Sequence, residues 1–400
     1  MTPRHTVYGG PQVEDLITRI LDDARQAMAG VMTRARYRAV LLIGGYGRGE
    51  GGVVTDGGEE RPHNNLDFLV ITRPGVNGAE LKHRLTAQLA PVAGRHRIGM
   101  DVGVISERQL LGAPCLVMWH DMRFGHRLLL GDQHFVPALH RFRPDAIEPW
   151  DVRNLLVNRG TLLVINELIL AKPVRTEADR RTVIRHAVKA IIGYGDALLY
   201  FLGEYHWSYR EKQIRMAARH DVPAPFRRLY QRAIEFRFRP AYHEFAACDL
   251  ARWNRTLREA LGTVHLQCER LRLGVPGLEW DGYADAAFGA SLREALRSPR
   301  TAARRLRALA QAQRPIPVRG LRARIGMRLS PGRDRLPLLF PGVAYPSQAA
   351  GMASLAAGAL AVTGGLLAPE RAYLTQWGIH GDANFVTALQ ALGLSLQEAA

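Results

Sequence analysis

A run of glycines directly after an apolar segment is the feature of this sequence that most constrains its fold. Residues 41–54 read LLIGGYGRGEGGVV, with six glycines, one arginine and one glutamate. Glycine has no Cβ, so a loop of this kind lets another group come very close to its backbone. The group that approaches the glycine backbone is either another part of this chain or a bound ligand, and the segments that follow help to decide which.

The apolar spacing predicts alternating strands and helices over residues 1–145, followed by a change of character. Turn residues at 53–64, including two adjacent glycines, predict a turn or hairpin excursion after the glycine run. The expected helices are residues 12–28 and 78–92, and the expected strands are 39–44, 66–72, 98–106 and 127–132.

Beyond residue 145 the strand signals fade and helical spacing takes over. We expect a helical bundle over residues 146–275 and a basic, Ala/Gly-rich C-terminal extension over residues 276–400. The predicted fold class is therefore α+β: a mixed β-sheet with flanking helices, an α-helical bundle, and a basic helical extension.

A dinucleotide-binding loop is one interpretation of the glycines. Gly47, Gly49 and Gly52 fit the spacing G-x-G-x-x-G after a strand. In that motif the third glycine opens a helix whose amides hold the pyrophosphate. Here the chain continues into VVTDGGEERPHNN, which cannot form that helix, so the pattern disfavours this interpretation.

Acidic residues on two later strands favour a different chemistry. Positions 65 and 67 in NNLDFLV point to the same side of a strand, and Asp101 lies among apolar residues in IGMDVGVI. Metal-dependent phosphoryl transfer needs carboxylates that converge from adjacent strands on magnesium. The glycine backbone can approach phosphate oxygens there, and Arg48 adds a positive fork.

In this order, LIGGYGRGE, NNLDFLV and GMDVGVI resemble the motifs of the polymerase-β-like nucleotidyltransferase superfamily. The segment DMRFGHRLLLGD, residues 121–132, is similar to the helix and strand that often follow the third acid in that family. The resemblance covers residues 38–132, and the helical bundle behind it matches only by architecture, as in the minimal and antibiotic-nucleotidyltransferase branches.

The resemblance implies transfer of a nucleoside monophosphate from a triphosphate, ATP in the first place, to a hydroxyl of a small molecule, a protein or RNA. It implies Mg²⁺ as cofactor, with a two-ion site in the complete motif. The implied residues are Asp67 and Asp101 for catalysis, Asp67, Asp101 and Asn65 for the metal, and Gly44, Gly45, Arg48 and Asn65 for the nucleotide.

Asn65 departs from the family pattern, because an acid is usual at this position. An amide oxygen can touch a metal but carries no charge and bridges two ions poorly. Nearby acids that could compensate are Glu50, Asp56, Glu59 and Glu60. Two hypotheses follow: an active nucleotidyltransferase, or a catalytically degenerate one that binds a nucleotide or a partner. Capping at the entry of a strand would also explain Asn65 and Asp67.

The net charge of +17 raises the question of a polyanionic partner, although only four of the 54 basic residues are lysine. Residues 293–335 hold 13 arginines against two acids, a surplus of 11. This segment is either an arm that binds RNA, DNA or another polyanion, or a solvated face.

The remaining features predict a cytoplasmic protein without a membrane anchor. The N-terminus lacks an apolar signal core, and the three cysteines form no disulfide or metal-ligand pattern. Residues 349–368 are long enough to span a membrane but consist largely of Ala and Gly. We expect them to form a closely packed helix or helix pair.

Overall fold

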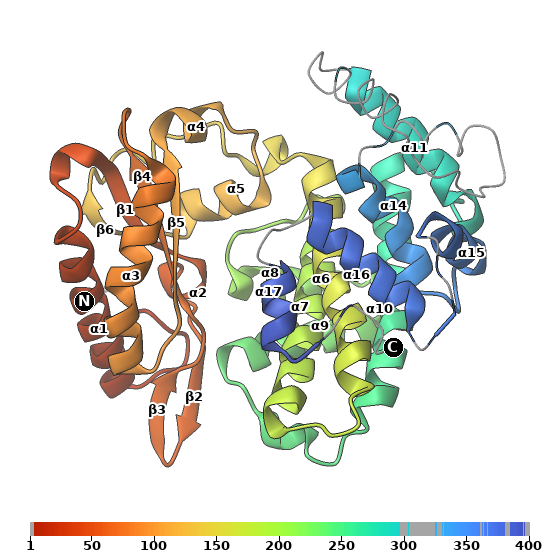
Figure 1. Cartoon of the computed structure of the whole chain (residues 1–400), viewed down its shortest axis with the longest axis horizontal. Helices are drawn as coiled ribbons and strands as arrows, with labels where there is room; N and C mark the ends of the chain where they lie inside the picture. Colours follow the sequence, from red (N-terminus) through yellow and green to blue (C-terminus); the bar gives the residue numbers. More distant parts are fainter. Residues whose placement is uncertain are drawn as a thin grey trace. The chain divides into compact units, whose positions relative to one another are not determined.

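The computed structural model describes residues 4–296, 332–360, 364–365, 367–380 and 385–394, with residues 303, 325, 330, 362 and 396 in isolation. The chain is a mixed α+β protein that divides into two compact units (Figure 1). Unit 1 is Met1–Asp151 with Glu204–Ala241, and unit 2 is Val152–Gly203 with Tyr242–Ala400. Residues 204–241, which the sequence placed in the helical bundle, thus belong with the α/β part.

Unit 1 is built around a four-stranded sheet in the order β5-β4-β1-β6 (Figure 1). β1 runs antiparallel to β4 and β6, whereas β4 and β5 are parallel. The strands are β1 (Tyr37–Ile43), β4 (Leu66–Thr72), β5 (Met100–Ser106) and β6 (Arg127–Gly131). All four strands expected from the apolar runs are present, within two residues of their predicted bounds.

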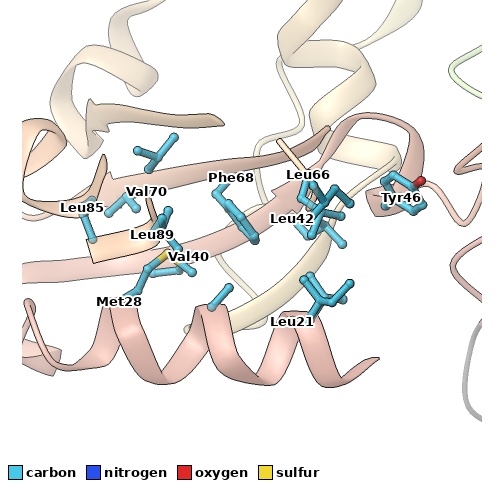
Figure 2. Packing of buried hydrophobic residues seen from close by; sticks show 14 of the residues in the cluster. Leu21, Met28, Val40, Leu42, Tyr46, Leu66, Phe68, Val70, Leu85 and Leu89 are labelled. Atoms are coloured by element: carbon cyan, nitrogen blue, oxygen red, sulfur yellow. The ribbon is translucent and has the colours of Figure 1, made fainter. Parts of the chain in front are cut away.

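Two helices cover one face of this sheet. α1 (Pro11–Ala29) turns Leu21 and Met28 toward the strands, and α3 (Gly78–His96) contributes Leu85 and Leu89 (Figure 2). From the sheet, alternate residues meet them, among them Val40, Leu42, Phe68 and Val70. Because side chains alternate along a strand, the residues between these positions face the opposite side.

The residues that follow the glycine run form a hairpin, as expected. β2 (Val53–Asp56) pairs with β3 (Glu59–Pro62) in a separate two-stranded sheet, which extends beyond the main sheet in Figure 1. Gly57 and Gly58 form its tip with φ of 58° and 86°. Two positive φ values in succession are typical of a tight hairpin turn that favours glycine.

Unit 1 also contains four helices that follow β5 or come from residues 204–241. They are α4 (Glu107–Gly112) and α5 (Val117–Phe124) after β5, and α8 (Tyr209–Ala218) and α9 (Ala224–Phe238) from the later segment. Ser208 caps α8 by accepting a hydrogen bond from the Glu211 amide. α5 followed by β6 is the helix and strand expected over residues 121–132.

Unit 2 is helical in its described part. Arg258 on α10 donates to the carbonyl oxygens of Val343 and Ala344 on α14, both at 2.7 Å, which ties the C-terminal helices to the bundle. The described helices are α6 (Pro149–Leu170), which begins at the boundary of unit 1, α7 (Glu177–Phe201), α10 (Leu250–Leu273), α11 (Trp280–Leu296), α14 (Gly332–Ala344), α15 (Ala350–Ala359), α16 (Ala368–His380) and α17 (Phe385–Ala391).

The Ala/Gly-rich stretch forms the ten-residue helix α15, and α16 begins at Ala368. In the described part of the chain, no helix has the length and apolar character needed to cross a membrane. Most of the basic segment at residues 293–335 lies outside the described residues.

A buried histidine lies at the centre of the aromatic core of unit 2. The His265 ring is fully buried, with Tyr194, Trp280, Phe340 and Tyr345 at centroid distances of 5.6–6.0 Å. Its Nδ1 is 3.2 Å from the Tyr345 hydroxyl, and its Nε2 has no hydrogen-bond partner among the described residues. Burial lowers the pKa of His265 from 6.5 to about 4.

This lowered pKa predicts loss of stability in mild acid. The folded state keeps His265 neutral down to about pH 4, whereas the unfolded chain takes up a proton near pH 6.5. The unfolded state therefore binds more protons between these values, and stability falls as the pH drops from 6.5 toward 4. Linkage gives a loss on the order of 2 kcal/mol at pH 5 from this group.

Urea unfolding at pH 7.5 and pH 5 measures this loss, with His265→Phe as the control. The variant lacks the hydrogen bond to Tyr345 at both pH values, but its stability should differ less between them, because phenylalanine does not titrate. An equal pH difference in both proteins would show that His265 is not the responsible group.

Candidate functional site

The two carboxylates predicted to act together lie side by side in the sheet. Asp67 is the second residue of β4 and Asp101 the second of β5, and the parallel register pairs them directly. Adjacent strands are about 4.8 Å apart, and register partners point to the same face. Since Phe68 and Val102 pack toward α1 and α3, Asp67 and Asp101 lie on the opposite face.

One of these carboxylates occupies the space next to Gly44, the first glycine of the loop. Gly44 has a φ of 68°, a conformation that L side chains rarely adopt. A Cβ placed on Gly44 would lie 2.5 Å from Oδ2 of Asp67. Two constraints therefore favour glycine at position 44: its left-handed backbone conformation and the carboxylate that lies over it. The end of β1 and the start of β4 meet at this point, where Ile43 pairs with Asp67.

Asn65 belongs to the same cluster, but as a hydrogen-bond donor. Its Nδ2 donates to Oδ2 of Asp101 at 2.9 Å. Its amide lies against Gly99, where a Cβ would come within 2.3 Å of Oδ1. Only the NH₂ end of the amide can donate to a carboxylate, which fixes this orientation chemically. Asn65 thus offsets part of the negative charge of Asp101, as an aspartate could not.

The rest of the glycine loop is packed around its own tyrosine. Tyr46 in the short helix α2 (Gly44–Gly47) is almost fully buried, and its ring occupies the space above Gly51, where a Cβ would lie 2.1 Å away. Its hydroxyl donates to the Gly52 carbonyl oxygen at 2.7 Å. Burial raises the pKa of Tyr46, so the hydroxyl stays protonated and keeps this bond. Asn64 accepts from the Gly52 amide at 3.1 Å.

Arg48, predicted to bind the triphosphate, contacts a different partner. Its guanidinium forms an ion pair with Asp121 on α5 at 2.7 Å, and the two side chains are only 8% and 11% exposed. Burial alone would lower the pKa of Arg48, but the attraction of Asp121 and its neighbours outweighs this and raises it. The Tyr205 hydroxyl donates to the other oxygen of Asp121 at 2.8 Å. Arg48 thus takes part in a buried interaction that connects the loop with α5, and through Asp121 with Tyr205 before α8.

Three of the nearby acids, Glu50, Glu59 and Glu60, have partners outside the cluster. Glu50 is buried and accepts from the Ser208 hydroxyl and from the backbone amides of Tyr209 and Arg210, at 2.5, 2.9 and 3.3 Å. A carboxylate at this end of α8 is stabilised by the helix dipole. Glu60 accepts from the Gly10 amide, and Glu59 pairs with Arg61.

A cation that the sequence did not point to lies beside the loop. Arg237, near the end of α9, places its Nη2 3.1 Å from the position that a Cβ on Gly45 would take. Its own carbonyl oxygen is 2.5 Å from the equivalent position on Gly52. The guanidinium lies over the Tyr209 ring at 4.3 Å. Only the arginine-rich composition of residues 209–239 signals such a residue, and it does not single out Arg237.

The structure thus brings Gly44, Asn65, Asp67 and Asp101 together, places Gly45 next to Arg237, and directs Arg48 elsewhere. Within the described residues there is no group of three or more His, Cys, Asp or Glu side chains arranged to hold a metal ion. Neither a family model nor a curated protein matches this chain. A functional assignment therefore has to start from this geometry.

The buried Arg48–Asp121 pair gives a direct test of its structural role. Asp121→Ala should reduce the free energy of unfolding by about 3–5 kcal/mol, because it leaves a buried guanidinium without its counter-charge. The double variant Arg48→Met/Asp121→Leu should cost clearly less, since it removes both charges and keeps much of the volume. Urea unfolding of both variants measures the difference. Equal losses would show that the uncompensated charge is not what matters.

Proposed function

We propose that this protein transfers a nucleoside monophosphate from a nucleoside triphosphate, ATP in the first place, to a hydroxyl acceptor and releases pyrophosphate. The observation that carries the proposal is the in-register pairing of Asp67 with Asp101 on parallel strands, beside the left-handed backbone of Gly44. It supports the arrangement that the resemblance to the polymerase-β-like nucleotidyltransferases implies, in which an acid pair lies next to a glycine turn.

The donor set fits Mg²⁺. Two carboxylates at the spacing of neighbouring strands are the protein ligands that Mg²⁺ commonly has, with substrate phosphates and water completing its shell. Asp67 and Asp101 would hold the ion, which when bound neutralises the triphosphate and aligns the reacting oxygens. With Asn65 donating to Asp101, the set suits one ion better than two.

The other residues of the cluster have separable roles in this proposal. Gly44 and Gly45 form the backbone against which the triphosphate lies, and Gly44 leaves room for Asp67. Asp101 is exposed on the edge strand β5, which suits a base that takes the proton from the acceptor hydroxyl. Asn65 orients the Asp101 carboxylate through its amide.

A second candidate function is binding without turnover, and one observation favours it. The amide of Asn65 occupies Oδ2 of Asp101, an oxygen that would otherwise be available to a cation. A degenerate nucleotidyltransferase that binds a nucleotide or a partner protein would tolerate this bond, whereas a two-ion enzyme would not. The two candidates share the fold and differ in catalysis.

Label transfer distinguishes the two candidates. Incubation of the protein with α-labelled ATP, Mg²⁺ and a cell extract should move label onto an acceptor if the protein is an enzyme. Asp67→Ala should reduce transfer at least about 100-fold, since it removes one of two metal carboxylates. Asp22→Ala, on the exposed side of α1, is the matched control and should retain activity. Absence of transfer under all conditions, with nucleotide binding preserved, would favour the binding protein.

The Asn65 bond predicts how an aspartate would behave in its place. Asn65→Asp replaces a hydrogen bond to Asp101 with repulsion between two carboxylates, so the melting temperature should fall without metal. Millimolar Mg²⁺ should restore it, and nucleotide should add further protection by mass action. Asn64→Asp is the control, because it adds the same charge one residue earlier, where the side chain accepts from Gly52.

Thermal unfolding with and without Mg²⁺ measures both variants. A recovery confined to Asn65→Asp would locate the metal site between β4 and β5. If the two variants respond alike to Mg²⁺, the ion does not bind at the paired aspartates.

A further inference from the structure

We propose that Arg237, rather than Arg48, is the side chain of this protein that binds the phosphate groups of its ligand. The inference rests on the proposed function for the class of ligand, a nucleoside triphosphate. Its physical basis is separate, because it concerns a cationic site for polyphosphate that is independent of catalysis.

Arg237 and Asp67 lie against consecutive residues of the glycine loop. The Asp67 carboxylate covers Gly44, and the Arg237 guanidinium covers Gly45. A polyphosphate chain needs both signs of side chain close by, a carboxylate to share its cation and an arginine to bind its oxygens directly. In unit 1 the residues that meet this requirement come from β4 and from the end of α9.

The Tyr209 ring supports the Arg237 guanidinium through a cation–π contact. The group is 4.3 Å from the ring centroid, and Tyr209 is itself anchored through its backbone amide, which donates to Glu50 at 2.9 Å. A guanidinium held over an aromatic ring can still donate its N–H groups in pairs to phosphate oxygens. Such a group is preorganised, so little side-chain freedom is lost on binding.

One hydrogen-bond donor of Arg237 has no acceptor within the described residues. Its Nε is buried there without a hydrogen-bond partner. Arg48, by contrast, has its carboxylate partner in Asp121. Unused donors on a charged, partly buried group are costly unless a ligand accepts from them.

Three cations gather around the Tyr209 ring. Arg48, Lys212 and Arg237 lie over it at 4.9, 4.4 and 4.3 Å. Arg48 is paired with Asp121. Arg237 is the cation of the three whose guanidinium lies against Gly45.

Binding of sodium tripolyphosphate in the absence of metal tests the site, by isothermal titration calorimetry on the full chain. Arg237→Gln should weaken binding about tenfold or more, because an arginine–phosphate pair is charge-assisted and bidentate. It should also make the affinity less dependent on salt concentration. Arg228→Gln, an exposed arginine on the same helix, is the matched control and should bind as the unchanged protein does.

Arg237→Lys covers the case in which the glutamine variant does not fold. It keeps the charge but not the planar fork, so the affinity for tripolyphosphate should fall by a smaller factor. Equal affinity in the lysine variant and the unchanged protein would overturn the proposal. So would equal effects of Arg237→Gln and Arg228→Gln, or no tripolyphosphate binding by the unchanged protein.

The outcome is separable from that of the proposed function. Loss of tripolyphosphate binding in Arg237→Gln, without any label transfer by the unchanged protein, would support the phosphate site and contradict the proposed transferase activity. Label transfer that Arg237→Gln leaves unchanged, together with unchanged tripolyphosphate affinity, supports the transferase and removes this site.

Discussion

The site depends on one backbone interaction, the parallel hydrogen-bonded ladder between β4 and β5. This ladder sets Asp67 opposite Asp101, at the spacing of neighbouring strands, where two carboxylates repel each other. Two carboxylates so close repel each other in the absence of a counter-charge, and the sheet overcomes that repulsion through the rest of its register. A slip of one residue in either strand would turn its aspartate to the face that packs against α1 and α3, so the apolar core enforces the acid pair.

The glycine loop is as constrained as the sheet, and mostly by the protein itself. Asp67 lies over Gly44 and the Tyr46 ring over Gly51, and each would clash with a side chain there. Arg237 lies over Gly45 at a tight but less restrictive distance. A loop of this composition is usually interpreted as room for a ligand backbone contact. Here the protein's own side chains already take much of that room. Under the proposed function, the phosphates would lie on the backbone between Asp67 and Arg237.

The sequence predicted the parts of unit 1 that local patterns determine. Apolar runs located β1, β4, β5 and β6, and the alternation of side chains along a strand placed Asn65 and Asp67 on one face. It did not predict that residues 204–241 join this unit, because their helical spacing is the same whichever core they cover. For the same reason it did not show that Arg48 pairs with Asp121 or that Arg237 lies over Tyr209, because these residues are close only in the folded chain.

The amide of Asn65 changes the net charge of the site relative to the acid that is usual at this position. An acid here would add a third negative charge to Asp67 and Asp101, and the site would then be stable only with a cation. The amide reverses this, because it donates to Asp101 and stabilises the pair without any ion. Under the proposed function, the missing negative charge has to come from the triphosphate. The nucleotide would then form part of the metal site, and the free protein would hold magnesium weakly. A cation on the protein, such as Arg237, is what such an arrangement needs to bind the nucleotide before the ion is secured.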